Sequence, residues 1–378
     1  MTQSADPKGD SILGENAAVA AGRPLLSELD ATAVMSFPPI KLDHLLLLCD
    51  DTGVFQHAAY GVPNRNEGYC TDDVARAIVF LCRYEPARSS PQLMEVLSRC
   101  ISFLHFANRP DGTFHNFLLY DRTWNDSIGS EDSQGRALWS AGTASRSAAL
   151  SPAARHAAQE VFRRSAHRIA QFRSPRSSSF AMLGCADVHD IDIAQDMLRT
   201  GANFLLRCFD VADYGGWHWF ERYLTYCNAR IPQALYMAYS VLKNEEYFAV
   251  AERSLQFLIQ VMFEQDVLSV PGNHAWYEAG GRKSEFDQQP VEAGTMVEAL
   301  SCAYRLTGNP AYLQRAQQAL MWYHGRNRHG QSLIDTATGA CYDGLMPSGI
   351  NRNQGAEATL SYLLARCEYE AAVRATPG

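Results

Sequence analysis

Helix-forming segments of two kinds alternate along this sequence. Segments of the first kind, such as residues 73–84 and 355–371, are apolar almost all round, which indicates helices that are buried on most sides. Segments of the second kind, such as residues 152–172, interleave Arg, Gln and Glu with apolar positions and are typical of helices with one exposed face. The buried segments begin at intervals of roughly 45 to 65 residues, so the repeating unit is a pair of helices.

Six such pairs can close into a ring, and we expect an all-α (α/α)6 toroid that spans residues 37–378 as one domain. An open helical solenoid with the same pairing is the alternative architecture. Residues 1–36 are rich in Ala, Ser, Gly and Asp, and are expected to form a poorly ordered tail. Helices are predicted at residues 38–49, 73–84, 92–107, 134–142, 152–172, 178–186, 190–208, 229–242, 246–263, 290–306, 310–325 and 355–371.

The links between these helices differ in length in a regular way. Links from a buried helix to the next amphipathic helix are short, whereas most return links are long. The long links cover residues 49–71, 108–133, 210–228, 264–288 and 327–353. In a toroid the inner helices run parallel, so these loops would gather at one end, where a rigid scaffold supports binding and catalysis.

Composition excludes several classes of function. The formal net charge is −8 and no dense Lys/Arg run occurs, so a nucleic-acid partner is not expected. No apolar run approaches the ~18 residues of a membrane span, and no secretory leader pattern opens the chain, which predicts a cytoplasmic protein without membrane insertion. The ten cysteines are scattered without a Cys-x-x-Cys pair and are interpreted as free thiols. No nucleotide, dinucleotide or metal motif is present, so neither a cofactor nor a metal is expected.

Five short polar cassettes, rich in Asp, Asn, Gln and Glu, stand directly before buried helices. They cover residues 68–73, 129–134, 226–230, 286–289 and 351–355. For a single acid in such a cassette, capping of its helix is the simpler interpretation. Because there are five of them at one expected end of a ring, we predict that they form the rim of a single pocket.

The long loops repeatedly place Gly beside aromatic and hydrogen-bonding residues. Aromatic faces can support the C–H faces of sugar rings, while Asp, Asn, Gln, His and Arg satisfy hydroxyl groups. The pattern favours a neutral carbohydrate, although such loops could also simply plug a toroid. The side chains expected to contact the sugar are His57, Tyr69, His115, Glu131, Arg136, Trp217, His218, Trp219, Asn228, Arg230, His274, Trp276, Gln288, Asp343, Gln354 and Glu357.

Glycoside hydrolysis needs one carboxylic acid as proton donor and a second carboxylate as base or nucleophile. Glu221 stands among four aromatic residues, where loss of water would favour the protonated acid, and it is the first candidate for the donor. Asp132, Asp72 or Asp73, and then Asp287 are candidates for the base, since a helix N-terminus favours the anion.

Three histidines offer a different chemistry. His115, His218 and His274 stand at comparable positions in three return loops, so their imidazoles could approach one cavity. Two opposed histidines can transfer protons at a carbon next to a carbonyl, as in a sugar epimerase or isomerase.

Six stretches of this sequence carry specific motifs: Asp50 to His57, Glu67 to Ala77, Gly129 to Arg136, Trp217 to Glu221, Phe286 to Pro290 and Asn353 to Glu357. These motifs resemble those of a bacterial family of six-hairpin, glycosidase-like proteins, which occur alone or joined to glycosyltransferase domains. The resemblance covers roughly residues 40 to 370 and implies an (α/α)6 fold, a carbohydrate ligand and an association with a glycosyltransferase system. It assigns no nucleophile, acid or base. Cys227 stands where such relatives are expected to carry Asp.

The sequence therefore predicts a glycoside hydrolase that acts on an oligosaccharide or polysaccharide, with inversion at the anomeric carbon. A histidine-dependent sugar epimerase or isomerase is the first alternative. A non-catalytic glycan-binding module associated with polysaccharide synthesis is the second.

Overall fold

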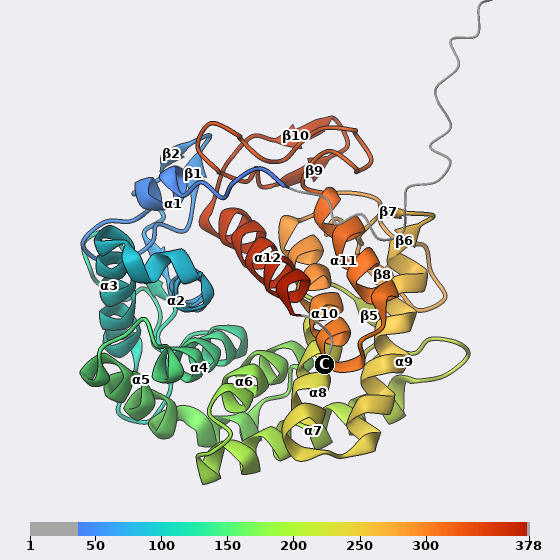
Figure 1. The fold of residues 1–378 in the computed structure, drawn as a ribbon, viewed down its shortest axis with the longest axis horizontal. Coiled ribbons are helices and arrows are strands. Elements are labelled where there is room, and N and C mark those ends of the chain that lie inside the picture. Colours follow the sequence, from blue (N-terminus) through green and yellow to red (C-terminus); the bar gives the residue numbers. More distant parts are fainter. Residues whose placement is uncertain (1–36, 376–378) are drawn as a thin grey trace, which may run out of the picture. The chain divides into compact units, whose positions relative to one another are not determined.

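The computed structural model describes residues 37–375, and these form a closed ring of paired helices (Figure 1). Each inner helix packs against the next, and the last packs against the first. The inner helices are α2 (Thr71–Arg83), α4 (Glu131–Arg146), α6 (Pro175–Asp187), α8 (Arg230–Leu242), α10 (Pro290–Thr307) and α12 (Ala356–Arg374). The predicted (α/α)6 toroid is confirmed, and the open solenoid is wrong because α12 closes on α2. The tail expected at residues 1–36 lies outside the described residues.

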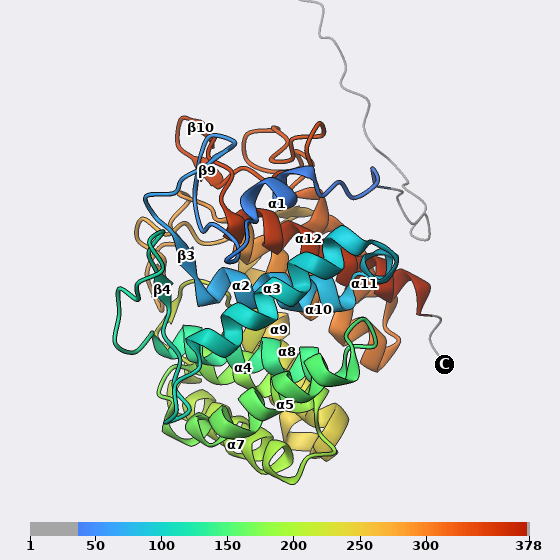
Figure 2. The ribbon, with the colours of Figure 1, turned by 90° about the vertical axis from the view of Figure 1, so that its left-hand side faces the viewer.

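The amphipathic helices form the outer layer of the ring. From α3 onward, each covers the inner helix that precedes it, as α3 covers α2 (Figure 2). The outer helices are α1 (Asp43–Leu48), α3 (Pro91–Ala107), α5 (Pro152–Ser165), α7 (Asp192–Ala212), α9 (Glu245–Met262) and α11 (Pro310–Met321). The single helix predicted over residues 152–172 ends at Ser165 and continues as the 3-10 helix η2 (Ala166–Gln171).

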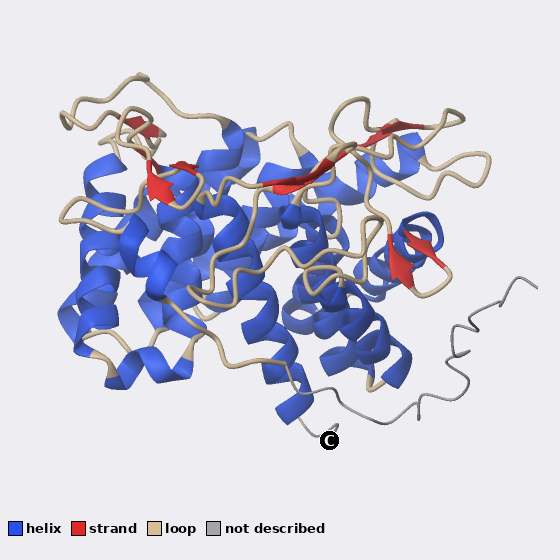
Figure 3. Ribbon diagram, turned by 90° about the horizontal axis from the view of Figure 1, so that it is seen from above, coloured by secondary structure: helices blue, strands red, loops and turns tan. Residues whose placement is uncertain are grey.

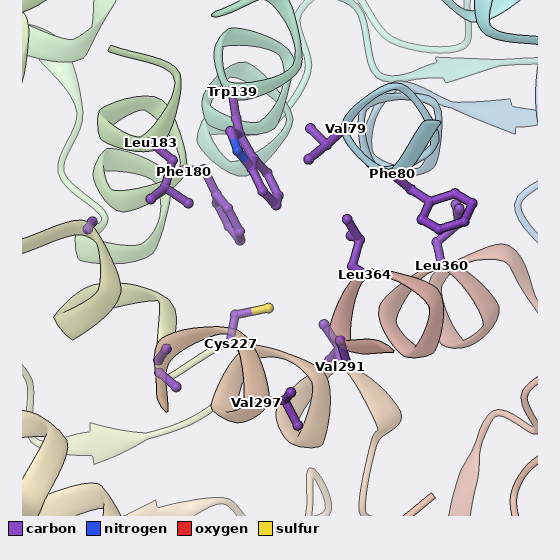
Figure 4. Packing of buried hydrophobic residues seen from close by; sticks show 14 of the residues in the cluster. Val79, Phe80, Trp139, Phe180, Leu183, Cys227, Val291, Val297, Leu360 and Leu364 are labelled. Atoms are coloured by element: carbon purple, nitrogen blue, oxygen red, sulfur yellow. The ribbon is translucent and has the colours of Figure 1, made fainter. Parts of the chain in front are cut away.

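The core fills the middle of the ring. Val79, Trp139, Phe180 and Leu364 converge on the axis from four inner helices and are almost fully buried (Figure 4). Burial of side chains of this size contributes about 1.5–3 kcal/mol each. The apolar pattern all round these segments therefore reflects contacts on every side.

Helix ends follow from local side chains. Ser130, Ser151 and Ser174 each accept a hydrogen bond from the backbone N–H three residues later, which caps α4, α5 and α6. At α2 the cap is the Cys70 thiol, whose sulfur accepts from the Asp73 N–H. The sequence predicted that this helix begins near residue 178, but α6 begins at Pro175. Proline is favoured at the first position of a helix, which explains the earlier start.

Short antiparallel strand pairs tie the return loops together on one side of the ring (Figure 3). Pairing β3 with β4 joins the loops before α2 and α4, with Tyr69 opposite Leu118. The β5–β8 pair joins the loops before α8 and α10. The pairs are β1 (Ala58–Ala59) with β2 (Val62–Pro63), β3 (Tyr69–Cys70) with β4 (Phe117–Leu118), β5 (Tyr223–Leu224) with β8 (Tyr277–Glu278), β6 (Phe263–Glu264) with β7 (Val267–Leu268), and β9 (Gly344–Met346) with β10 (Gly349–Asn351). Between residues 37 and 375 no helix is both long and apolar enough to cross a membrane.

Candidate functional site

A cavity of about 400 Å³ opens at the end of the ring where the inner helices begin. We call it the central cavity. Its walls come from the first turns of four inner helices and from the loops that precede them. The lining residues are Gln56, His57, Cys70, Asp72, Asp73, Arg76, Phe117, Arg136, Asn273, Asp287, Gln288, Gln289, Pro290, Asp343, Gly344, Met346, Asn351, Gly355, Glu357 and Ala358.

A second hollow of about 740 Å³ continues from the central cavity across the starts of α4 and α6. The two share Asp72, Phe117, Arg136 and Glu357, and we call the second hollow the side lobe. The other residues that line it are Asn116, Ser130, Glu131, Asp132, Arg173, Ser174, Ser177 and Tyr226. Together the two hollows form a continuous depression that is rich in carboxylates.

Two buried arginines organise the carboxylates of this depression. Arg76 donates to Asp73 Oδ1 at 2.7 Å and to Glu357 Oε2 at 2.5 Å. Arg136 donates to Asp72 Oδ1 at 2.8 Å and to Asp132 Oδ2 at 3.3 Å. Each guanidinium is therefore already paired with two carboxylates, and neither is left with an uncompensated charge for a ligand.

The acids at the helix starts differ in their surroundings. Burial raises the pKa of Asp73 above its usual value, although Arg76 opposes this. Burial acts in the same direction on Asp132, but Arg136 and the Ser177 hydroxyl outweigh it and hold the pKa of Asp132 below its usual range. Asp72 also accepts from Asn116 Nδ2 at 3.0 Å. Neither Asp72 nor Asp73 supplies the side-chain cap of α2, because Cys70 does.

Asp287 and Asp343 stand in a different part of the central cavity, on two loops that pair with each other. The Gln288 and Leu345 backbones exchange two hydrogen bonds of 2.9 Å, which fixes one loop against the other. Asp287 lies next to this bridge, and no described residue between 37 and 375 forms an ion pair or hydrogen bond with its carboxylate. Asp343 Oδ1 accepts from the Gly355 N–H at 2.7 Å. Burial raises the pKa of Asp343, and this backbone contact only partly opposes it.

The structure brings ten of the sequence-predicted site residues to the two hollows. His57, Asp72, Asp73, Arg136, Asp287, Gln288, Asp343 and Glu357 line the central cavity, and Glu131 and Asp132 line the side lobe. Two of these side chains also form hydrogen bonds with neighbouring segments of the fold. Glu131 accepts from the Arg173 and Ser174 N–H groups, just before α6. The Gln288 amide oxygen accepts from the Trp322 indole at 3.1 Å.

Glu221, the predicted proton donor, lines neither hollow. Its carboxylate accepts from Arg176 Nη1 at 2.6 Å, and it borders a separate, mainly apolar hollow beside α7. The aromatic residues around it pack elsewhere: Trp219 is fully buried against Phe220, and the Trp217 indole donates to the Glu221 carbonyl. The surroundings of the Glu221 carboxylate are therefore ionic, because Arg176 reaches it from α6.

The three predicted histidines do not meet. His115 stacks on Trp124 at 4.8 Å between ring centroids, and His218 Nδ1 contacts Asp213 Oδ1 at 2.6 Å. His274 is exposed, and its neighbour Asn273 lines the central cavity instead. None of the three lines either hollow.

The remaining predicted binding residues lie outside the lining of both hollows. The Tyr69 hydroxyl donates to Asp50 at 2.6 Å, and Arg230 pairs with Glu298 at 2.7 Å deeper in the ring. Asn228 is fully buried, and Trp276 lies 6.3 Å from Tyr226 between ring centroids. Gln354 and Trp217 also lie outside the lining of both hollows.

Sequence reasoning missed several residues that line the depression. Tyr226 stands in the third cassette, and its place two residues before Asn228 was the available signal. Asn116, Phe117 and Asn273 belong to loops whose aromatic and polar character was noted. Ser177 gave no signal, because α6 is preceded by a short link without a cassette. Across residues 37–375, no three His, Cys, Asp or Glu side chains are grouped so that they could hold a metal ion.

No protein-family model matches the chain, and no curated protein matches it. Solved structures do resemble it. Cellobiose 2-epimerase from Bacillus thermoamylovorans B4167 superposes with a TM-score of 0.67 at 10% identity, over 89% of this chain and 96% of the other. A D-mannose isomerase gives 0.66 at 13% identity, over 86% and 93% of the two chains. A GH76 alpha-mannanase from Bacteroides thetaiotaomicron gives 0.55 at 11% identity, over 81% and 87%. At such identities the likeness is one of fold, and it is the (α/α)6 ring that these proteins share with this chain.

Proposed function

We propose that this protein is a glycoside hydrolase that acts on a neutral oligosaccharide by carboxylate general acid/base catalysis. The observation that carries the proposal is the composition of the central cavity, which is lined by Asp72, Asp73, Asp287, Asp343 and Glu357. Hydrolysis of a glycosidic bond requires two carboxyl groups in different protonation states. Of the two acids on the paired loops, Asp343 has a pKa that burial raises, and Asp287 has no ion-pair or hydrogen-bond partner among the described side chains.

Asp343 is the proton donor in this proposal, and it replaces Glu221 in that role. Its raised pKa keeps the carboxyl group protonated at higher pH than an exposed aspartate. The proton passes to the glycosidic oxygen as the bond from that oxygen to the anomeric carbon breaks. Asp287, which has no partner among the described side chains, takes a proton from the water that attacks the anomeric carbon. Action through water rather than through a covalent intermediate inverts the anomeric configuration.

The charges of the cavity favour a neutral substrate. Arg76 and Arg136 are each bound by two carboxylates, so neither offers an unpaired cation to a sulfate, phosphate or uronate group. Gln56, His57 and Asn273 provide hydrogen-bonding groups for hydroxyls. Phe117, which is 43% exposed and lines both hollows, offers an apolar face for a sugar ring.

The epimerase alternative needs two opposed imidazoles, and the arrangement of histidines does not favour it. Of the histidines in the part of the chain that the structure describes, His57 alone lines the depression. The second alternative is a glycan-binding module without catalytic activity, and the experiment below distinguishes it from a hydrolase. An association with a glycosyltransferase system, which the resemblance implies, is compatible with either function.

A panel of neutral oligosaccharides, followed by proton NMR, tests the proposal. We expect free reducing ends to appear, with the new anomer opposite to that of the bond cleaved. Conversion of the reducing-end sugar without cleavage would establish the epimerase instead. Saturation-transfer signals from a bound oligosaccharide without any conversion would establish a binding module.

A further inference from the structure

The turn Tyr226–Asn228, between β5 and α8, is held from two sides by buried charged groups. From α6, Arg176 Nε donates to the Tyr226 carbonyl at 2.5 Å, and Arg176 Nη2 donates to Asn228 Oδ1 at 3.3 Å. From α10, Glu292 accepts from the Cys227 N–H, and it accepts from Asn228 Nδ2 at 2.8 Å. The turn is therefore clamped by a guanidinium and a carboxyl group that belong to different inner helices.

The clamp is almost completely removed from water. Arg176 is 4% exposed, Glu292 is 2% exposed and Asn228 is fully buried. Ionisable groups are rarely buried to this extent unless partners compensate them, because loss of hydration is costly. Glu221 supplies one such partner, through its 2.6 Å contact with Arg176. The residue that sequence reasoning placed at the reaction centre thus belongs to this support.

The backbone of the turn needs such support. Cys227 has a φ of 49°, in the left-handed region that residues other than glycine rarely adopt. Its N–H points at Glu292, and its sulfur lies 3.9 Å from Arg136 Nη2, facing the ring axis (Figure 4). The conformation persists because contacts on both sides of Cys227 fix it.

The turn presents Tyr226 to the side lobe. The Tyr226 ring lies beneath the Arg176 guanidinium, whose Cζ is 5.0 Å from the ring centroid, and burial together with the nearby Asp132 carboxylate raises the pKa of the Tyr226 hydroxyl. Both Tyr226 and Asp132 line the side lobe. A tyrosine beside a carboxylate offers a sugar unit an aromatic face and a paired hydrogen-bonding group at one place.

We propose that Glu292, Arg176 and Glu221 are positioning residues that aim Tyr226 at Asp132, and that this pair binds the sugar unit that occupies the side lobe. The binding part of this inference rests on the proposed function. The positioning part does not, and it can be tested without a substrate.

Glu292→Gln is the first test of the positioning part. The Cys227 N–H and the Asn228 amide donate to different oxygens of Glu292, and Gln replaces one of these oxygens with an NH2 donor, so one of the two hydrogen bonds is lost. With 13C-labelled tyrosine, the Tyr226 resonance is identified by its absence in Tyr226→Phe. We expect that resonance to shift in Glu292→Gln, and to shift less in Glu221→Gln, because the Glu221 side chain is 32% exposed and contacts Arg176 rather than the turn itself. An unchanged Tyr226 resonance in both variants would overturn the proposal, whatever the activity.

Glu252→Gln is the matched control. Glu252 also accepts from two donors, the Tyr236 and Tyr312 hydroxyls, but it lies outside the ring of inner helices. This variant should move the Tyr236 and Tyr312 resonances and leave that of Tyr226 in place. A shift of the Tyr226 resonance in this control would mean that the resonance responds to a general loss of packing in the protein rather than to the contacts of Glu292 with the turn.

The binding part is tested with the oligosaccharide that the panel identifies as a substrate. Glu292→Gln and Tyr226→Phe should each raise KM about tenfold, roughly the loss of one hydrogen bond to a charged group, with kcat little changed. The double variant should lose no more than the larger single effect, because both changes break one arrangement. Additive losses would show that Glu292 acts elsewhere. If the wild-type protein converts no oligosaccharide, the proposed hydrolase and the binding part both fail, while the resonance shifts still decide the positioning part.

Discussion

Arg76 of α2 and Glu357 of α12 form an ion pair of 2.5 Å that both lines the central cavity and joins the first inner helix to the last. Arg76 is buried, whereas the Glu357 side chain is 45% exposed on the cavity side. The same guanidinium binds the buried Asp73. One guanidinium therefore both links α2 to α12 and binds two of the carboxylates that line the cavity.

Replacing Arg76 by Met should be strongly destabilising. The substitution keeps much of the side-chain volume but leaves Asp73 buried without its counter-charge, and breaking a buried pair in this way typically costs about 3–5 kcal/mol. Urea unfolding followed by circular dichroism measures the effect. Arg199→Met, which removes a guanidinium that is 54% exposed and paired within α7, should cost less than about 1 kcal/mol. Equal losses in the two variants would contradict this account of Arg76.

Stability should depend on pH through Glu292. Burial raises the pKa of this carboxyl from its ordinary 4.5 to about 7, and the Asn228 amide and backbone N–H groups oppose the shift only in part. Between these two values the unfolded chain binds fewer protons at this site than the folded one does. The contribution of Glu292 to the free energy of unfolding therefore decreases as pH rises from about 4.5 to 7, by up to about 3 kcal/mol.

Comparison with Glu292→Gln isolates this contribution, because Gln does not titrate. Urea unfolding of both proteins at intervals from pH 5 to pH 8 should show the stability of the wild type declining relative to that of the variant. A constant difference across this range would mean that Glu292 does not change its protonation on folding.

Asp343→Asn should abolish most of the proposed activity. Loss of a general acid typically reduces the rate by about 10²–10⁴-fold, and an amide cannot replace the proton donated to the leaving oxygen. In the wild type, activity should fall as pH rises through the raised pKa of Asp343, because only the protonated form donates. Asp196→Asn, an isosteric change at an exposed position on α7, should leave kcat/KM unchanged. Full activity of Asp343→Asn on the identified substrate would remove Asp343 from the mechanism.

Much of the fold follows from signals that are local in sequence. Apolar character all round a helix, as at Val74 to Leu81, reports neighbours on every side, and the asymmetry of link lengths places the long loops at one end of the ring. The cassettes before α2, α4 and α10 bring Asp72, Asp132 and Asp287 to one depression for the same reason.

The roles of individual acids could not be predicted from the sequence, because these roles depend on contacts between segments that are far apart in the chain. Glu221 stands among aromatic residues in the sequence, yet Arg176 reaches it from 45 positions earlier in the chain. Asp343 and Asp287 are brought into one cavity by the bridge between Gln288 and Leu345, which no periodicity signals. The histidine loops are similar in sequence, but His115 and His218 each form a hydrogen bond within their own loop and do not line the cavity.

The close approach of α4 and α6 offers a test of packing at Gly184. A Cβ atom at Gly184 of α6 would lie 2.4 Å from the Leu138 carbonyl oxygen of α4, and a Cβ at Gly142 would lie 2.3 Å from the Gly184 carbonyl oxygen. Because the obstacle is backbone, Gly184→Ala can be accommodated only if α4 and α6 move apart, and overpacking of this kind costs about 1–3 kcal/mol or more.

Gly201→Ala in α7 is the matched comparison. Its added Cβ would meet the flexible Met182 side chain at 2.7 Å and the Ser178 hydroxyl at 3.1 Å, rather than backbone. The gain in helix propensity of about 1 kcal/mol should offset much of that crowding, so Gly201→Ala should be close to neutral. The midpoints of thermal unfolding should therefore separate, with Gly184→Ala several degrees below Gly201→Ala. Because Trp139 follows Leu138 on α4 and stacks on Phe180 of α6 at 6.2 Å between centroids, Gly184→Ala should also change the tryptophan fluorescence. Similar midpoints for the two variants would show that α4 and α6 can separate without loss of the core.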